Sequence, residues 1–241
     1  MEKRTIAFYL PQYHPFQEND EWWGKGFTEW RNVVKAKPLY RGHYQPHLPA
    51  DLGFYDLRLS EVREQQAEMA QNYGLSGFCY YHYWFNGHQL MERPLKEVLD
   101  SGKPNFPFML CWANENWTRA WDGGEKQILI AQNHSERDDR IHIRYLLDNV
   151  FSDSRYIKVD GKPVFMIYRS ALFPNIKETI RVWREEAALK GDELYLCRVE
   201  TEEYYGEKYL QDGFDAAVEF QPFTHPVSYT HLRAHETSLH L

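Results

Sequence analysis

The feature that most constrains the fold is a regular alternation of short apolar segments with longer amphipathic ones. Buried strands are expected at residues 5–13, 75–85, 105–115, 162–170, 193–200 and 214–220. Amphipathic helices are expected at residues 60–74, 89–102, 138–151, 175–191 and 205–213. Ser60 reads as the N-cap of the first helix and Gly74 as its stop. Nearly all-apolar strands separated by helices predict a parallel sheet covered by helices.

Two architectures satisfy this alternation, a doubly wound sheet and a (β/α)8 barrel. No GxGxxG or GxxxxGK[ST] sequence follows the first strand, so the usual phosphate-binding turn of a doubly wound sheet is missing. Polar and aromatic residues instead follow several strands, as at the active-site face of a barrel. They are Gln12, Tyr13, His14, His82, Tyr83, Trp84, Asn114, Glu115, Asn116 and Glu219. We therefore expect an α/β fold of the TIM-barrel class.

The expected barrel is incomplete, because about six βα units are present and closure needs eight. Residues 227–241, VSYTHLRAHETSLHL, show neither strand alternation nor a helical stripe, and they resemble a translated sequencing adapter. We expect residues 1–226 to form a partial TIM-barrel domain and residues 227–241 to be a non-native tail. A genuine polar tail is the alternative.

Composition and charge exclude several classes of protein. The net charge of −7 provides no footprint for nucleic acid or anionic lipid. No apolar run reaches about 18 residues, and Pro11 and Gln12 interrupt the N-terminal run, so neither a membrane span nor a signal peptide is expected. Cys79, Cys111 and Cys197 lie singly in apolar runs, which predicts buried, reduced thiols and a cytoplasmic protein. The ligand spacing of a metal site is missing, and no metal or cofactor is expected.

Residues 111–123, CWANENWTRAWDG, place three tryptophans among amide and charged side chains. Amides beside a carboxylate can exchange hydrogen bonds with vicinal hydroxyls, and indole faces pack on the C–H face of a sugar ring. We expect substrate contacts from Trp112, Asn114, Glu115, Asn116, Trp117, Arg119, Trp121 and Asp122. A core position is the alternative for Trp112. Arg119 and Asp122 are expected either to pair and order the loop or to contact a charged substrate.

Two other segments have the same aromatic and polar character. In YYHYWF (80–85) alternation sends His82 and Trp84 to one face of the strand and Tyr83 to the other, and all three are expected to contact substrate. A hydrogen-bonded core histidine is the alternative for His82. Near the N-terminus, the loop at 19–33 is too aromatic for disorder, and loops of this length are usually functional or disordered. The substrate contacts expected in this region are Tyr9, Gln12, Tyr13, His14 and Trp30.

A glycosidase needs two carboxylates that flank the bond, roughly 5–5.5 Å apart for retention or 6.5–9.5 Å for inversion. The strand ends offer Glu115 and Glu219, on the third and sixth strands, which can face each other across a barrel. Glu29 and Asp122 lie in loops. Glu115 and Glu219 are therefore the catalytic candidates that the sequence supplies, and no close pair occurs on one strand.

The motifs FYLPQYHP, WWGKGFTEW, GFCYYHYWF, CWANENWTRAWDG and GFDAAVEF resemble, in this order, the glycoside hydrolase family 99-like group. This group includes the WbsX-like proteins of bacterial polysaccharide gene clusters, and the resemblance covers about residues 4–226. It implies a (β/α)8 barrel that acts on an O-antigen or capsule glycan. The founding hydrolases are similar to endo-α-mannosidases and use two glutamates in an Asn-Glu-Trp-x-x-Glu segment. That segment is missing here, and NENW (114–117) shares only the Asn-Glu pair.

Together these observations predict a glycosidase-like barrel that acts on bacterial surface polysaccharide and is truncated before its catalytic strands. As it stands the chain is expected to be inactive, and whether its parent is an enzyme stays open. One alternative is a glycosyltransferase of lipopolysaccharide biosynthesis, although the sequence lacks a DxD metal motif and a basic diphosphate cradle. Another is a non-catalytic glycan-binding barrel. The expected partner is an oligo- or polysaccharide, and the oligomeric state stays open.

Overall fold

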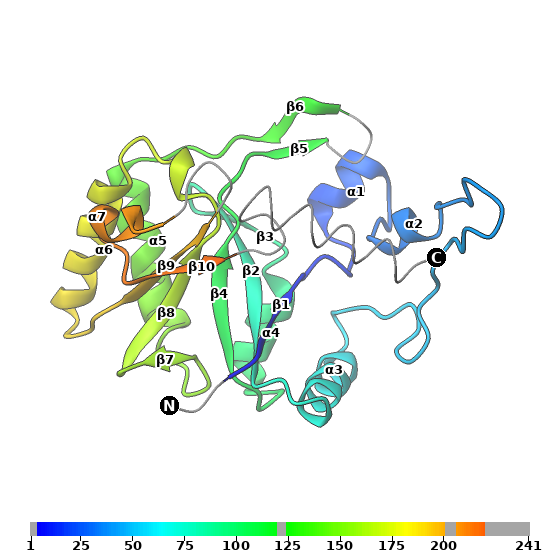
Figure 1. Ribbon diagram of the computed structural model, residues 1–241, viewed down its shortest axis with the longest axis horizontal. Helices are drawn as coiled ribbons and strands as arrows, with labels where there is room; N and C mark the ends of the chain where they lie inside the picture. The colour runs from blue at the N-terminus through cyan, green and yellow to red at the C-terminus, as the bar shows by residue number, and fades with distance from the viewer. Residues whose placement is uncertain (1–3, 120–123, 201–205, 220–241) are drawn as a thin grey trace. The chain divides into compact units, whose positions relative to one another are not determined.

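The computed structural model describes residues 4–119, 124–200 and 206–219 of the chain (Figure 1). They form two compact units, unit 1 within residues 1–81 and 90–108 and unit 2 within residues 82–89 and 109–241. Strand β2 (Gly77–Phe85) belongs to both, with its last four residues in unit 2. All six expected strands are present, each shorter than or as long as the sequence pattern suggested.

Unit 1 is built on one parallel strand pair and the helix that connects it. Strand β1 (Ile6–Tyr9) pairs with the first residues of β2, with Ile6 opposite Gly77. Helix α3 (Ser60–Asn72) runs between them and buries Ala67 and Ala70. The Tyr9 hydroxyl on β1 donates to Gln66 Oε1 on α3 at 2.6 Å. Helices α1 (Gln17–Trp23), α2 (Trp30–Val33) and α4 (Arg93–Ser101) complete this unit.

Unit 2 carries the longer run of parallel strands. Its order is the end of β2, then β4 (Phe108–Trp112), β8 (Lys162–Ile167), β9 (Tyr195–Glu200) and β10 (Ala216–Glu219). The pairs β4–β8, β8–β9 and β9–β10 are parallel, so their carboxyl ends lie at one edge of the sheet. The connecting helices are α5 (Glu136–Asn149), α6 (Ile176–Leu189) and α7 (Lys208–Asp212).

Several shorter strands and one 3₁₀ turn accompany these longer strands. Strand β5 (Trp117–Arg119) pairs antiparallel with β6 (Gly124–Ile130), β3 (His88–Leu90) pairs with β2, and β7 (Lys158–Val159) pairs with β8. A 3₁₀ turn, η2 (Ser170–Leu172), follows β8. The β5–β6 hairpin lies directly after β4 along the chain, so it extends the segment that the sequence marks as the site.

An aromatic layer fills the space between the strands of unit 2 and helices α5 and α6. Trp112 on β4 and Trp183 on α6 are both fully buried, with ring centroids 6.0 Å apart. Phe165 on β8 packs on Trp183 at 5.4 Å, and His142 on α5 packs on Trp112 at 4.5 Å. Each of these large rings removes a large apolar area from water and so contributes to the core of unit 2.

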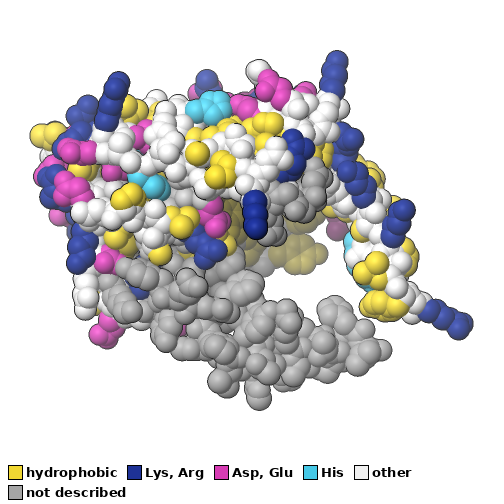
Figure 2. Space-filling view, turned by 90° about the horizontal axis from the view of Figure 1, so that it is seen from above, with side chains coloured by type: hydrophobic (Ala, Val, Ile, Leu, Met, Phe, Trp, Pro, Cys, Tyr) yellow, Lys and Arg dark blue, Asp and Glu magenta, His cyan; other side chains and the backbone are white. Residues whose placement is uncertain are grey.

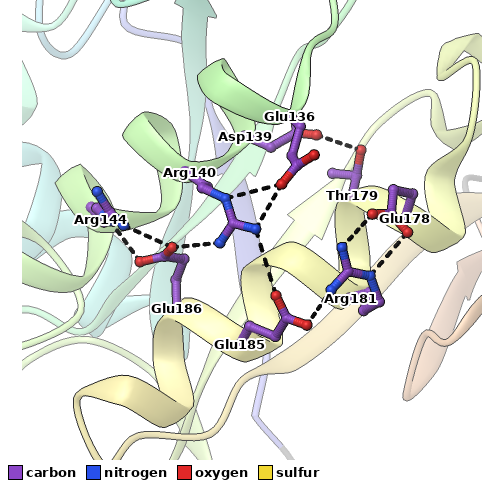
Figure 3. Close-up of polar contacts among 9 residues, drawn as sticks. All are labelled: Glu136, Asp139, Arg140, Arg144, Glu178, Thr179, Arg181, Glu185 and Glu186. Carbon is purple, nitrogen blue, oxygen red and sulfur yellow. Dashed lines mark hydrogen bonds and ion pairs between the residues drawn. The ribbon is translucent and has the colours of Figure 1, made fainter.

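The solvent side of the helix pair is joined by ion pairs between α5 and α6 (Figure 3). The buried carboxylate of Glu186 accepts from Arg140 Nη1 at 2.7 Å and from Arg144 Nε at 2.6 Å. These two arginines hold the pKa of Glu186 below its usual value. The hydroxyl of Thr179 donates to Asp139 at 2.8 Å in the same interface. The two helices are therefore fixed by polar contacts as well as by the aromatic layer.

Several local expectations need correction. Ser60 is the first helical residue, with Leu59 at the N-cap and no capping side chain. Helix α4 begins at Arg93 and not at residue 89, because Pro94 is tolerated only in a first turn, where its missing N–H costs nothing. Residues 88–90 are instead strand β3, and the expected loop at 19–33 contains helices. Gly74 ends α3 as expected, with φ +80°, and the three cysteines are buried and form no disulfide.

Candidate functional site

Asn114, at the carboxyl end of β4, is fully buried and is held by the loop that follows β8. Its Nδ2 donates to the Arg169 carbonyl at 2.9 Å, and its Oδ1 accepts from the Arg169 N–H at 2.8 Å. The Tyr168 N–H also donates to the Trp112 carbonyl at 3.0 Å. Asn114 therefore joins the ends of two neighbouring strands, and because it is fully buried it is not presented to a ligand.

Arg169 and Glu115 form the charged part of this edge. Arg169 Nε donates to Glu115 Oε1 at 3.1 Å, and the two side chains are 41% and 45% exposed. The guanidinium carbon lies 5.5 Å from the ring centroid of Tyr168, over its face. Burial and then the Glu115 charge raise the pKa of the Tyr168 phenol, which keeps it neutral. The guanidinium is thus held at one edge and on one face.

Asn116 and Trp117 continue the edge into the β5–β6 hairpin. Asn116 Oδ1 accepts from the Gln132 N–H at 2.7 Å. The half-buried Trp117 ring meets the edge of Tyr83 at 5.3 Å, in a T-shaped arrangement. Tyr83 is itself buried on the face of β2 opposite His82. The Trp117 indole therefore packs against a core tyrosine and keeps part of its surface exposed.

We call Glu115, Asn116, Trp117 and Arg169 the β4–β8 rim. Within the described part of the chain, Glu115 Oε2, the Asn116 amide nitrogen and both Arg169 Nη atoms make no hydrogen bond. The rim therefore presents one carboxylate acceptor, one amide donor and two guanidinium donors beside a partly exposed indole. Convergent polar groups next to an aromatic face are what a carbohydrate site requires.

Three residues predicted to contact substrate lie in the aromatic layer of unit 2 instead. His82 Nε2 and His142 Nε2 are 2.9 Å apart, and burial lowers the pKa of His82 to about 3. Trp84 Nε1 donates to Asp138 Oδ1 at 3.1 Å, and Trp112 is 1% exposed. His82, Trp84 and Trp112 are all buried in this structure, and their contact with substrate stays a prediction. They are buried because strand alternation directs these three side chains toward α5.

In unit 1 the residues after β1 form an aromatic cluster. Trp30 packs on Tyr13 at 4.6 Å and on Tyr55 at 4.9 Å, and its Nε1 donates to the Tyr55 carbonyl at 2.8 Å. Burial raises the pKa of Tyr13, and the Glu29 charge adds to this shift. Tyr13 and Trp30 thus lie together, and both keep partial exposure.

The other predicted N-terminal residues differ in exposure. His14 is buried, and burial lowers the pKa of its imidazole to about 4 against the raising effect of Asp56. Tyr9 is buried with its hydroxyl on Gln66, whereas Gln12 is half-buried. His14 and Tyr9 therefore act as packing residues of unit 1 in this structure.

A pocket of about 480 Å³ lies in unit 1, against β1 and α3. Its walls include Tyr9, Tyr13, Tyr55 and Phe78, and the Gln66 amide oxygen in its wall already accepts the Tyr9 hydroxyl. The pocket is mainly apolar, with few groups to orient a sugar. It is therefore a weaker candidate for a glycan site than the β4–β8 rim.

Glu29 is a half-buried residue with one buried carboxyl oxygen, which sequence reasoning noted in a loop but did not select. Burial raises its pKa to about 8, against a hydrogen bond with the Asn32 side chain that lowers it. It lies just before Trp30 at the start of α2. Its only sequence signal was its place in the aromatic loop, and burial of a loop carboxyl cannot be read from spacing.

Arg169 is the rim residue that sequence reasoning missed. It directly follows the fourth apolar strand, in KPVFMIYRS, so the strand-end rule applied to the other strands would have found it. Glu219 ends β10, opposite Glu200 in the parallel register, and is exposed. Arg119 lies half-buried on β5. Trp121 and Asp122 lie outside the described residues, so their part in the site stays a prediction.

The described residues also bear on metal binding and on membrane insertion. Among them, no group of three or more His, Cys, Asp or Glu side chains is arranged to hold a metal ion. Within the same ranges, none of the helices combines the length and apolarity needed to span a bilayer.

The sequence matches a protein-family model and is similar to two curated relatives. The family model described as "Glycosyltransferase WbsX" matches residues 5–240. Two relatives from Xanthomonas campestris pv. campestris, strains B100 and ATCC 33913, are described as the uncharacterized protein WxcX. Each is 47% identical over 218 residues, which cover 90% of this chain and 31% of the relative. The chain thus spans less than a third of these relatives, and the boundary expected at residue 226 stays a prediction.

Solved structures give a likeness of fold. Two structures of the GH99 endo-alpha-mannosidase from Bacteroides thetaiotaomicron, one with BIS-TRIS-propane, match 98% of this chain at TM-score 0.55. They are 15% and 16% identical, and the match covers 66% and 68% of those chains. A glycoside hydrolase-like protein matches 90% of this chain and 58% of its own at TM-score 0.54 and 16% identity. This likeness confirms the expected α/β fold with the parallel strands of an incomplete (β/α)8 barrel.

Proposed function

Because the chain belongs to the WbsX glycosyltransferase family, we propose that it is part of a carbohydrate-active barrel that acts on bacterial surface polysaccharide. Membership in this family and the GH99-like fold both support carbohydrate as the ligand class. The reaction of the whole protein and the glycan that it acts on belong to the same proposal.

The observation that carries the proposal is the β4–β8 rim. Four hydrogen-bonding positions on Glu115, Asn116 and Arg169 make no bond to another described residue, and they lie at the strand edge that serves as the active-site face in (β/α)8 enzymes. Trp117 follows Asn116 directly in the chain, and its half-buried ring supplies an aromatic surface. Asn114 holds the array in place, because it fixes the backbone of Arg169 at both its N–H and its carbonyl.

We favour a glycosidase-like role over transfer from a nucleotide-activated donor. A retaining or inverting mechanism needs a carboxylic acid and a second carboxylate. Glu115 supplies one carboxylate at the rim, and Glu219 at the end of β10 is the second candidate on the same run of strands.

Tryptophan fluorescence tests the binding part of the proposal. The full chain would be titrated with size-fractionated oligosaccharides from bacterial capsule and O-antigen, beside Trp117→Ala and, as a matched control, Trp22→Ala, which alters a half-buried indole of α1 in unit 1. We expect saturable quenching that Trp117→Ala weakens and Trp22→Ala leaves in place. Absence of any saturable change with every glycan would overturn the proposal.

Product analysis separates the reactions. Incubation with polysaccharide alone would release shorter chains if the protein hydrolyses glycans, and Glu115→Gln would abolish this release. Elongation that requires an added nucleotide sugar would instead favour the transferase alternative. Saturable binding without either product would favour a glycan-binding barrel.

On the face shown in Figure 2, basic and acidic side chains are interspersed, and we propose no role in nucleic-acid binding.

A further inference from the structure

We propose that the β4–β8 rim selects acidic glycans, with the outer edge of Arg169 binding an oxyanion carried by a sugar, either a uronate carboxylate or a phosphate ester. This inference rests on the proposed function, since it names the class of glycan that the same rim takes. It goes beyond that function because a rim of hydroxyl-binding groups alone has no preference for charge.

Arg169 is presented in a fixed orientation. Its backbone is fixed by the side-chain amide of Asn114, whose Nδ2 donates to the Arg169 carbonyl at 2.9 Å and whose Oδ1 accepts from the Arg169 N–H at 2.8 Å. Its side chain is held at Nε by Glu115 at 3.1 Å and over the ring of Tyr168. A guanidinium held at its inner edge and on one face loses little conformational freedom when it binds a ligand, which favours affinity.

The outer edge of the guanidinium is open to a ligand. Neither Nη atom bonds another described residue, and the side chain is 41% exposed. Two parallel N–H groups match the two oxygens of a carboxylate or phosphate in a bidentate, charge-assisted arrangement. By contrast, Arg140 and Arg144 on α5 both donate hydrogen bonds from their guanidinium groups to the Glu186 carboxylate.

Glu115 determines how the selection works. Its carboxylate already balances the charge of Arg169, so the rim attracts an anion through directed donors more than through net positive charge. Glu115 Oε2 makes no hydrogen bond to another described residue. It would repel an anion that carries no donor, but it would accept a hydrogen bond from a hydroxyl. A hexuronate whose O4 is unsubstituted satisfies both conditions, because C5 carries the carboxylate and the neighbouring C4 carries a hydroxyl. A lysine, with a single ammonium group, could not reproduce this pattern.

The test compares an oligouronate with the same oligosaccharide after chemical reduction of its carboxylates to hydroxymethyl groups. A third ligand is the neutral oligosaccharide bearing a 6-phosphate. Affinities would be measured by calorimetry at constant ionic strength for the full chain, Arg169→Met, Arg169→Lys and the control Arg181→Met. Arg181 pairs with Glu178 and Glu185 on α6, away from the β4–β8 rim, and has the same size and charge as Arg169.

We expect the parent chain to bind the oligouronate or the phosphorylated ligand at least about tenfold more tightly than the neutral one. Arg169→Met should bring this ratio to about one, Arg169→Lys should leave an intermediate ratio, and Arg181→Met should leave it unchanged. Whichever oxyanion binds better identifies its source. Equal affinity of the parent chain for acidic and neutral ligands would overturn the inference while the proposed function stands. Absence of binding to all three would overturn both.

Discussion

Asn114 and Arg169, 55 residues apart in the chain, are joined by two hydrogen bonds in which one buried amide serves both the N–H and the carbonyl of the arginine backbone. The amide nitrogen donates at 2.9 Å and the amide oxygen accepts at 2.8 Å. This contact links the ends of β4 and β8 and places the Arg169 side chain beside Glu115. The rim is therefore organised by a residue that is itself fully buried.

Substitution of Asn114 tests this organisation. Asn114→Ala would leave the Arg169 N–H and carbonyl without partners, and we expect a loss of about 1–3 kcal/mol in the free energy of unfolding. The exposed Asn116 provides the matched control, and Asn116→Ala should cost no more than about 0.5 kcal/mol. Urea denaturation of the two variants gives the comparison. Equal small losses would show that the Asn114 amide does not hold the strand ends together.

The two tryptophans on either side of Asn114 should respond in opposite ways. Trp112→Ala removes a fully buried ring from the aromatic layer, and we expect a loss of roughly 3–5 kcal/mol in stability. Trp117→Ala removes a half-buried ring, and we expect a folded protein whose affinity for oligosaccharide is about tenfold lower. Thermal unfolding and glycan titration of both variants test the pair. Retained glycan affinity in Trp117→Ala would argue against a role for this indole.

The buried histidine pair predicts acid sensitivity. Burial lowers the pKa of His82 to about 3 and that of His142 well below its usual value, and His82 lowers the latter further. An unfolded chain therefore binds more protons than the folded one below pH 6.5, so this stabilisation is present above pH 6.5 and is lost as the pH falls toward 3. We expect a slope of up to about 1.4 kcal/mol per pH unit for each histidine.

Urea denaturation between pH 7.5 and 4 measures that slope. The double variant His82→Asn, His142→Asn keeps polar groups in place but cannot titrate, so its slope should be shallower than that of the parent. Burial also lowers the pKa of His14, to about 4, and this residue adds a slope of the same sign to both proteins. Identical pH dependence of the parent and the double variant would contradict the assignment to this pair.

Glu29 predicts the opposite pH dependence. Burial raises its pKa to about 8 from a usual value of about 4.5. The folded chain therefore holds a proton that the unfolded chain has lost, so this contribution is present below pH 4.5 and disappears as the pH rises through 8. Glu29→Gln should gain stability relative to the parent as the pH rises from 5 to 8.5. A constant difference between the two proteins across this range would show that the carboxyl is ionised in the folded state.

Strand and helix positions in this chain follow from local patterns. All six apolar segments form strands, and the five expected helices form with ends that shift by a few residues. Local pattern failed where a residue has a special role, as at Pro94, which starts α4 instead of interrupting it. It also failed at the hairpin of β5 and β6, whose polar sequence reads as a loop because neither strand alternates clearly.

The candidate site divides in the same way. CWANENWTRAWDG was identified from sequence, and Glu115, Asn116 and Trp117 lie at the rim, because polar residues after a buried strand reach the carboxyl edge of the sheet. Strand alternation alone could not say which face of a strand meets a helix. A core position was therefore an alternative for His82 and Trp112, whereas Trp84 was expected to contact substrate, and in the structure all three rings pack near His142 of α5.

The sequence by itself determined the fold class, the family and the segment of the candidate site, since these depend on residue order and periodicity. Tertiary structure decided which side chains of that segment are buried by partners distant in the chain. Asn114 is fully buried and bonds the backbone of Arg169, and no local pattern reports that contact. Arg169 itself entered the site for the same reason: β8 pairs with β4, which brings a residue 54 positions from Glu115 to within 3.1 Å of it.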